Sequence, residues 1–219
     1  MKKVAVVLSG AGVFDGAEIH ESVITLLALD RQGVEVQIFA PNIPQMHVVN
    51  HLSQQPADET RNVLVEAARI ARSKIKDLAQ ANINDFDAVI FPGGYGAAKN
   101  LCDFAVKGPD CKVNPVVEQF VADGLKAGKV MGFICIAPAL CARIAANTGV
   151  HPTLTIGTDK NAAAAVESLG ARHINCPVND IVVDEQNKIV TTPAYMLGQR
   201  ISEVADGIEK LVSKVLEMV

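Results

Sequence analysis

The sequence has no tryptophan, only two tyrosines and seven phenylalanines, and no run of five or six charges of one sign. Proteins that hold single-stranded nucleic acid use aromatic platforms and basic grooves, so we expect no nucleic-acid partner. Twenty-four acidic residues against twenty basic ones give a net charge of −4, which does not favour an anionic membrane surface either. No apolar stretch is long enough to cross a bilayer.

Signals for secretion and for metal or disulfide sites are also weak. Residues 1–10 begin like a signal peptide, but the apolar run is short and Asp15 and Glu18 follow it, so we interpret this segment as a buried first strand. The five cysteines are odd in number and lack C-x-x-C spacing. This pattern predicts reduced thiols in a cytoplasmic protein without a metal site.

Short apolar runs rich in valine and isoleucine alternate with longer segments of helical spacing along the whole chain. Such alternation predicts an α/β domain, residues 1–219, with a mainly parallel sheet covered by helices on both faces. Residues 184–188, between two short apolar runs, predict a hairpin and an antiparallel edge. The expected strands are 4–8, 34–39, 88–91, 130–134 and 181–183, and the expected helices are 19–32, 58–79, 113–127 and 202–216.

Cys135 is the most informative residue, because it directly follows an apolar strand, and Ala137 and Pro138 then start a helix. A thiol on such a strand-to-helix turn points outward beside free backbone amides. The helix N-terminus lowers a thiol pKa, so we expect an accessible, ionised nucleophile. The alternative is that Cys135 is a small buried hydrophobic residue, which is the usual role of a lone cysteine.

Two glycine-containing loops, residues 9–16 and 92–100, follow other strands and should meet Cys135 at the carboxyl edge of the sheet. The backbone amides of Gly94 and Ile136 could stabilise an oxyanion. Glu18 and Glu21, three residues apart on a helix, could each reach the thiol and carry a proton. The alternative is a solvated first turn that favours the helix dipole.

Three segments, residues 16–21, 92–101 and 134–138, resemble the ThiJ/PfpI family of the class I glutamine amidotransferase-like superfamily. The chain more narrowly resembles the ElbB (enhancing lycopene biosynthesis) group of this family in residues 9–21, 59–62, 157–159 and 190–196. The resemblance implies a flavodoxin-like three-layer sandwich, a homodimer and no bound cofactor. It implies that Cys135 is the nucleophile and that the backbone amides of Gly94 and Ile136 form the oxyanion site. It also implies that Glu21, the last residue of a G-x-E-x-x-E pattern, is the carboxyl that partners the thiol, and Glu18 is the second choice for this role. We expect His20, Asn100 and Thr158 near the substrate.

For the ElbB group the resemblance implies a glutathione-independent glyoxalase that converts glyoxal or methylglyoxal into glycolate or lactate. The sequence departs from the related peptidases, because Ile136 stands where they carry the histidine that follows the cysteine. The later loop 154–159 offers Thr158 and Asp159 but no histidine. Amide hydrolysis needs an acid for its leaving group, so this departure counts against peptidase or glutaminase activity. Two alternatives stay open: a glutaminase-like or hydrolytic domain linked to isoprenoid metabolism, and a non-catalytic cysteine sensor of redox or carbonyl stress.

Overall fold

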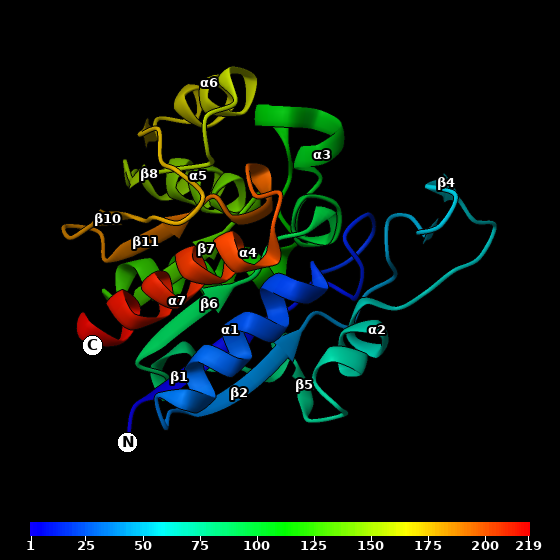
Figure 1. The fold of residues 1–219 in the computed structure, drawn as a ribbon, viewed down its shortest axis with the longest axis horizontal. Helices are drawn as coiled ribbons and strands as arrows, with labels where there is room; N and C mark the ends of the chain where they lie inside the picture. The colour runs from blue at the N-terminus through cyan, green and yellow to red at the C-terminus, as the bar shows by residue number, and fades with distance from the viewer.

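The computed structural model describes residues 1–219 and contains one seven-stranded sheet with the order β10-β11-β7-β6-β1-β2-β5 (Figure 1). All neighbouring strands are parallel except β10 and β11, which form an antiparallel hairpin at the edge. The strands of this sheet are β1 (Lys3–Val7), β2 (Glu35–Ala40), β5 (Ile75–Asp77), β6 (Ala88–Phe91), β7 (Val130–Ile134), β10 (Val182–Asp184) and β11 (Ile189–Thr192). Two-residue strands form two further small sheets: β3 (Val49–Asn50) with β4 (Gln55–Pro56), and β8 (Thr153–Leu154) with β9 (Arg172–His173).

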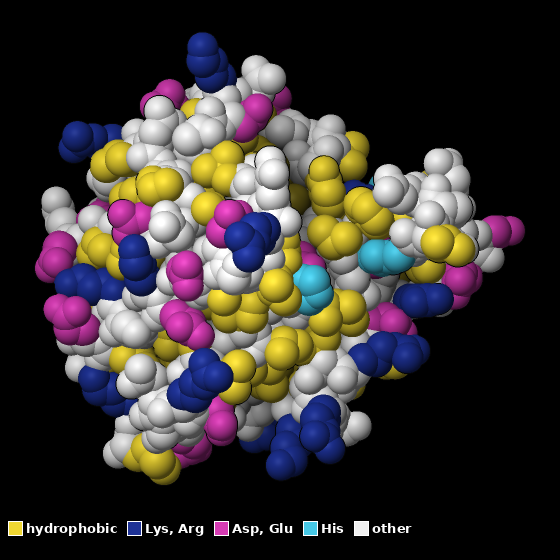
Figure 2. All heavy atoms as spheres, viewed as in Figure 1, with side chains coloured by type: hydrophobic (Ala, Val, Ile, Leu, Met, Phe, Trp, Pro, Cys, Tyr) yellow, Lys and Arg dark blue, Asp and Glu magenta, His cyan; other side chains and the backbone are white.

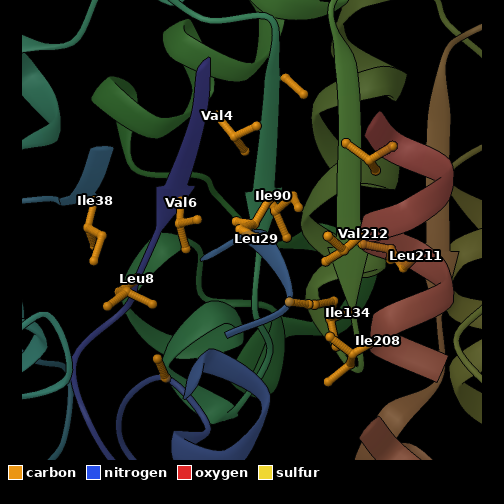
Figure 3. Packing of buried hydrophobic residues seen from close by; sticks show 14 of the residues in the cluster. Val4, Val6, Leu8, Leu29, Ile38, Ile90, Ile134, Ile208, Leu211 and Val212 are labelled. Carbon is orange, nitrogen blue, oxygen red and sulfur yellow. The ribbon is translucent and has the colours of Figure 1, made fainter. Parts of the chain in front are cut away.

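Helices cover both faces of the sheet because the central strands are apolar on both sides. Along β1, Val4 and Val6 pack toward one hydrophobic cluster, and Ala5 and Val7 pack toward the other. The first cluster includes residues of α1, α2 and α7, and Figure 3 shows Leu211 and Val212 of α7 beside the strands. The second includes residues of α4 and α5. The helices are α1 (Ile19–Arg31), α2 (Val63–Ile70), α3 (Phe104–Lys107), α4 (Pro115–Lys126), α5 (Ala137–Thr148), α6 (Lys160–Ser168) and α7 (Ile201–Glu217).

The structure confirms the expected fold class, a flavodoxin-like α/β sandwich with a C-terminal hairpin. The prediction of one helix over 58–79 is wrong, because only Val63–Ile70 is α-helical in this segment. Arg72 and Ser73 adopt left-handed backbone conformations with φ of 50° and 66°, which a helix does not accommodate. The chain then turns into the edge strand β5, which the sequence analysis did not predict.

The connection between β2 and α2 extends away from the body of the molecule and carries β3 and β4 (Figure 1). Its base is held against the loop that follows β1. The buried carboxylate of Asp15 accepts a hydrogen bond from the Val49 amide at 2.8 Å, and His51 Nε2 accepts one from the Phe14 amide at 3.3 Å. None of the helices combines the length and the hydrophobicity that spanning a bilayer requires.

Candidate active site

Loops from the central strands β1, β6 and β7 meet at the carboxyl edge of the sheet, as the sequence analysis predicted. Backbone hydrogen bonds join the first two loops directly: the Tyr95 amide donates to Val13 O, and the Gly96 amide donates to Gly16 O, each at 2.8 Å. The Glu18 amide donates to Gly93 O at 2.9 Å. This edge is the usual place for ligand binding in an open α/β sheet.

Cys135 occupies a sharp turn between β7 and α5. Its φ of 62° lies in the left-handed region, which costs energy for a residue other than glycine and is typical of functional turns. Its amide donates to Thr192 O at 2.9 Å, and the helix begins two residues later at Ala137 with Pro138 in the first turn. The turn agrees with the sequence analysis, but the side chain is only 7% exposed, so the thiol is buried instead of freely accessible.

Three neighbours influence the pKa of the Cys135 thiol, namely the Glu21 carboxyl and the amides of Gly94 and Ile136. Glu21 is completely buried. Its Oε2 accepts a hydrogen bond from the Gly93 amide at 2.9 Å, and its Oε1 accepts one from the Tyr195 amide at 3.3 Å. Glu21 is therefore the carboxyl beside the thiol, and the amides of Gly94 and Ile136 also act on the sulfur.

Burial dominates the acid–base properties of this pair. It raises the pKa of Glu21 to about 7, and the nearby charge of Glu18 adds to the effect. Burial, followed by the charge of Glu21, raises the pKa of Cys135 well above its ordinary value, although the Gly94 and Ile136 amides oppose this shift. The expected lowering of the thiol pKa by the helix N-terminus is therefore wrong, because desolvation outweighs the two donors.

Each group of the pair disfavours ionisation of the other, so the two lose their protons one after the other and hold a single proton between them once the pH exceeds about 7. The shared proton gives two arrangements, a thiol with a carboxylate or a thiolate with a carboxylic acid. The second combines a nucleophile and an adjacent acid in one site. The arrangement can therefore attack an electrophilic carbon and transfer a proton without a metal or a cofactor.

Glu18 has a different position from the one expected on the helix face beside Glu21. It is the N-cap of α1, with an extended backbone, and its Oε2 accepts a hydrogen bond from the Glu21 amide at 2.7 Å. Its side chain also lines the pocket over Cys135. Glu18 therefore fixes the start of the helix that carries Glu21 and raises the Glu21 pKa, while Glu21 makes the contact with sulfur.

The pocket over Cys135 has a volume of about 190 Å³, below the range of about 300–1,000 Å³ that is typical of sites for drug-sized ligands. It therefore suits a very small substrate. None of its lining residues is a histidine, which agrees with the absence of the peptidase pattern in the sequence. The lining residues are Val13, Glu18, Gly94, Tyr95, Cys135, Ile136, Tyr195 and Met196.

Of the three side chains expected near the substrate, only His20 reaches the pocket wall. Its exposed ring hydrogen-bonds through Nδ1 to the Tyr195 hydroxyl at 2.7 Å. Asn100 is instead buried in the loop framework, where its amide group donates to Ser9 O and to Asp15 O, both at 2.9 Å. Thr158 is exposed in the segment after β8 and does not line the pocket. The structure thus does not bring Asn100 and Thr158 into the site.

Tyr195 and Met196 line the pocket but were not assigned to it from the sequence. They follow β11, which is parallel to β7 and ends at the same edge of the sheet. The aromatic residue just after that strand was the signal that could have found them. Burial raises the pKa of Tyr195, and the charges of Glu18 and Glu21 raise it further, so its hydroxyl keeps its proton.

Residues 2–196 match the sequence profile of the DJ-1/PfpI family. The chain belongs to this family. It is also 49% identical over 226 residues to the human protein named "Glutamine amidotransferase-like class 1 domain-containing protein 3, mitochondrial", a match that covers 99% of this chain and 83% of the relative. These matches confirm the expected ThiJ/PfpI resemblance at the level of the family.

Solved structures agree with the family assignment. An isoprenoid biosynthesis protein with an amidotransferase-like domain from Ehrlichia chaffeensis superposes with a TM-score of 0.94 at 35% identity, covering 100% of this chain and 99% of that one. A glyoxalase III from Candida albicans superposes with a TM-score of 0.61 at 16% identity, covering 99% and 97%. At this low identity the second similarity shows the shared fold alone.

Proposed function

We propose that this protein is a glutathione-independent glyoxalase of the ElbB group, which converts glyoxal or methylglyoxal into glycolate or lactate. The observation that carries the proposal is the contact of a buried thiol with a carboxyl whose pKa is raised to about 7, under a pocket of about 190 Å³. A general acid–base group works best when its pKa lies near the working pH. One protein that shares the fold is named as a glyoxalase III.

In the first step, the Cys135 thiolate adds to the aldehyde carbon of the substrate. The amides of Gly94 and Ile136 stabilise the negative charge that develops on the aldehyde oxygen. The Glu21 carboxylic acid, which holds the proton of the former thiol, then protonates that oxygen. The product of this step is a neutral hemithioacetal beside a Glu21 carboxylate.

In the second step, the Glu21 carboxylate removes the hydrogen on the carbon bound to sulfur, and the electron pair moves toward the neighbouring carbonyl oxygen. As that proton returns to the neighbouring carbon, the hydroxyl on the sulfur-bearing carbon loses its proton and the neighbouring oxygen gains one. These transfers give a 2-hydroxyacyl thioester on Cys135. Water then cleaves the thioester, so the thiol is regenerated and the 2-hydroxy acid is released. The net reaction consumes one 2-oxoaldehyde and one water, with no leaving group to protonate and no external oxidant.

The direct test is formation of lactate from methylglyoxal by the purified protein in buffer without glutathione. We expect Cys135→Ala to abolish lactate formation and Glu21→Gln to lower it by about 100-fold or more, because each removes a group of the shared proton pair. Both variants should stay folded, as near-ultraviolet circular dichroism can check. Equal slow rates in the wild type and in Cys135→Ala would overturn the proposal.

The second candidate is a hydrolytic domain that serves isoprenoid metabolism, and the name of the similar Ehrlichia chaffeensis protein favours it. Release of ammonia from glutamine would support this candidate. The pocket lacks the lining histidine that usually protonates an amide leaving group, which argues against this candidate. The sensor alternative needs the Cys135 thiolate just as the glyoxalase does, so the raised pKa of Cys135 does not distinguish the two.

Three broader expectations are also proposals. Residues 1–219 form one domain, two copies associate as a homodimer, and the substrate is a small 2-oxoaldehyde with no nucleic-acid or membrane partner. The sequence-based expectation of a cytoplasmic protein stays a prediction, and the human relative is named as mitochondrial.

A further inference from the structure

A hydrogen-bonded pair of side chains connects the wall of the pocket to the protein surface. Tyr195 lines the pocket, and its hydroxyl lies 2.7 Å from Nδ1 of His20, whose ring is exposed. The two rings are tilted by 46° with centroids 5.8 Å apart, so the hydroxyl and the ring edge meet without stacking. The backbone amide of the same Tyr195 holds Glu21. One residue thus touches the proton carrier, the pocket and an exposed imidazole.

The proposed reaction needs a second proton donor that the Glu21 and Cys135 pair does not supply. When the hydrogen on the first carbon leaves, the neighbouring carbonyl oxygen must gain a proton, while Glu21 holds the proton just removed. The Gly94 and Ile136 amides already face the aldehyde oxygen and do not give up protons. Glu18 also lines the pocket, but its Oε2 accepts the hydrogen bond that caps the helix.

Two tyrosines line the pocket, and only one of them has a hydroxyl with a hydrogen-bond partner through which a proton could be replaced. Tyr95 is 49% exposed, and its hydroxyl has no hydrogen-bond partner. The hydroxyl of Tyr195 is instead held by His20. Its proton can be replaced from solvent along this hydrogen bond, because the His20 ring is exposed.

We propose that Tyr195 is a catalytic general acid of this site and that His20 positions its hydroxyl. Tyr195 protonates the carbonyl oxygen on the carbon next to the hemithioacetal carbon. This inference rests on the proposed glyoxalase function. As Glu21 takes the hydrogen from carbon, the Tyr195 O–H bond breaks and the oxygen of the substrate gains that proton, which gives an enediol. When Glu21 returns its proton to carbon, the hydroxyl on the sulfur-bearing carbon loses its proton to the Tyr195 phenolate, and the thioester forms.

The charges around Tyr195 explain why a histidine is needed there. The neighbouring carboxyl groups Glu18 and Glu21 and the burial of the ring raise its pKa, so they keep the hydroxyl protonated but make the transient phenolate costly. When its Nδ1 carries the proton, the imidazole of His20 can donate a hydrogen bond to the phenolate and compensate for that charge while it exists. His20 therefore acts through Tyr195 as a positioning residue and does not touch the substrate.

The first test is Tyr195→Phe, which removes the hydroxyl and keeps the ring and the amide that binds Glu21. We expect the rate constant for lactate formation to fall by about 100-fold, with KM changed by less than about twofold, as for the loss of a general acid. Alkylation of Cys135 by iodoacetamide should proceed at the wild-type rate, because the nucleophile is intact. His151→Gln, at an exposed histidine bonded to Gly170 O, is the matched control and should be unchanged.

The second test is His20→Ala, which leaves a gap beside the Tyr195 hydroxyl at the surface. We expect a smaller loss of rate, about 10-fold, that imidazole added to the buffer partly restores. A merely structural role would not respond to imidazole. A wild-type rate in Tyr195→Phe, or a loss in His20→Ala that imidazole does not change, would overturn the inference. If the wild type itself forms no lactate although Cys135 reacts with iodoacetamide, the proposed function fails and this inference fails with it.

Discussion

Glu21 and Cys135 form a single titrating unit, in which a full negative charge on either group disfavours one on the other. Burial sets this property, because both side chains are almost entirely withdrawn from water. The amides of Gly93 and Tyr195 stabilise the carboxylate, and those of Gly94 and Ile136 stabilise the thiolate. The balance lets one proton move over a short distance between oxygen and sulfur, which is the property that the proposed chemistry uses.

The raised pKa of Glu21 predicts how the stability of the protein depends on pH. The pKa is about 7 in the folded protein against 4.5 for an ordinary glutamate, so the folded state retains a proton that the unfolded chain releases between these values. The contribution of Glu21 to stability is present below about pH 4.5 and is lost as the pH rises to about 7. We expect the free energy of unfolding of the wild type to fall relative to that of Glu21→Gln by about 3 kcal/mol over this range.

Urea unfolding of the two proteins between about pH 4.5 and 8 measures this difference. Glu35→Gln, at an exposed side chain paired with Lys3, is the control and should follow the wild type across the range. A constant difference between the wild type and Glu21→Gln at all pH values would contradict the assignment of the raised pKa to this carboxyl.

At the scale of the elements, the site depends on how closely three loops approach one another. Gly93 is the tightest point: a Cβ there would lie 2.5 Å from Cys135 Cβ and 2.7 Å from Glu21 Oε2. Such distances are shorter than any van der Waals contact, so either the thiol or the carboxyl would have to move. Gly93 is thus needed to bring the thiol of Cys135 and the carboxyl of Glu21 together.

We expect Gly93→Ala to lower the free energy of unfolding by about 3 kcal/mol, as for an overpacked core, and to abolish lactate formation. Gly128→Ala is the control, because this glycine has a left-handed φ of 64° but open space around its Cα. It should cost about 1 kcal/mol from backbone strain and leave activity unchanged. Chemical denaturation and the lactate assay measure both effects, and equal losses in the two variants would contradict the role of close packing at Gly93.

Asn100 gives a second prediction at this scale, because its buried side chain hydrogen-bonds to the backbone of the loop after β1. Its side chain makes three hydrogen bonds to backbone groups: it donates to Ser9 O and Asp15 O and accepts from the Met46 amide. Asn100→Ala leaves these buried groups unpaired, so we expect a loss of about 2–4 kcal/mol in the free energy of unfolding. Denaturation by urea measures the loss, and KM for methylglyoxal should stay near the wild-type value. A large rise in KM with unchanged stability would contradict this structural role and would support the expected position of Asn100 near the substrate.

The sequence predicts the buried strands well, because their apolar runs are too short for helices and are rich in valine and isoleucine. The expected strands 88–91 and 130–134 have the same bounds as β6 and β7. The edge strand β5, Ile75–Asp77, was missed because it has a single apolar residue and depends on pairing with β2. Its conformation is imposed by tertiary contacts that no local pattern records.

The candidate site was predicted in part, for a related reason. Cys135, Gly94 and Ile136 lie in local turns whose chemistry is readable from adjacent residues. The burial of the Cys135 sulfur cannot be predicted from adjacent residues, because loops from several distant segments of the chain cover it. Tyr195 was missed because it comes from the end of β11, a strand whose place beside β7 follows from the topology and not from any motif.

At the scale of the whole molecule, an apolar stripe on α1 is the surface that best fits the proposed homodimer. Ile19, Val23 and Leu27, spaced by four residues on one side of the helix, are 46%, 48% and 43% exposed. Figure 2 shows hydrophobic side chains gathered over this helix. A stripe on one helix can pair with its own copy across a two-fold axis, because the same patch then serves both subunits.

We expect Val23→Glu to convert a dimer into a monomer, because two buried carboxylates would face each other across the axis. Sedimentation velocity over a range of protein concentrations measures the change. Val106→Glu, at a 63% exposed valine of α3, is the matched control and should stay dimeric. A monomeric wild type, or a Val23→Glu variant that remains dimeric, would contradict this placement of the interface.

The small volume over the thiol has a consequence for how the proposed enzyme would work among cellular metabolites. Aldehydes combine spontaneously with abundant cellular thiols, above all with the tripeptide glutathione. The resulting adduct is far too bulky for the pocket of about 190 Å³ over Cys135. Only the uncombined aldehyde can then enter. The flux through this protein would therefore rise when the pool of free thiols is depleted, so that it would act most when thiol-dependent detoxification fails.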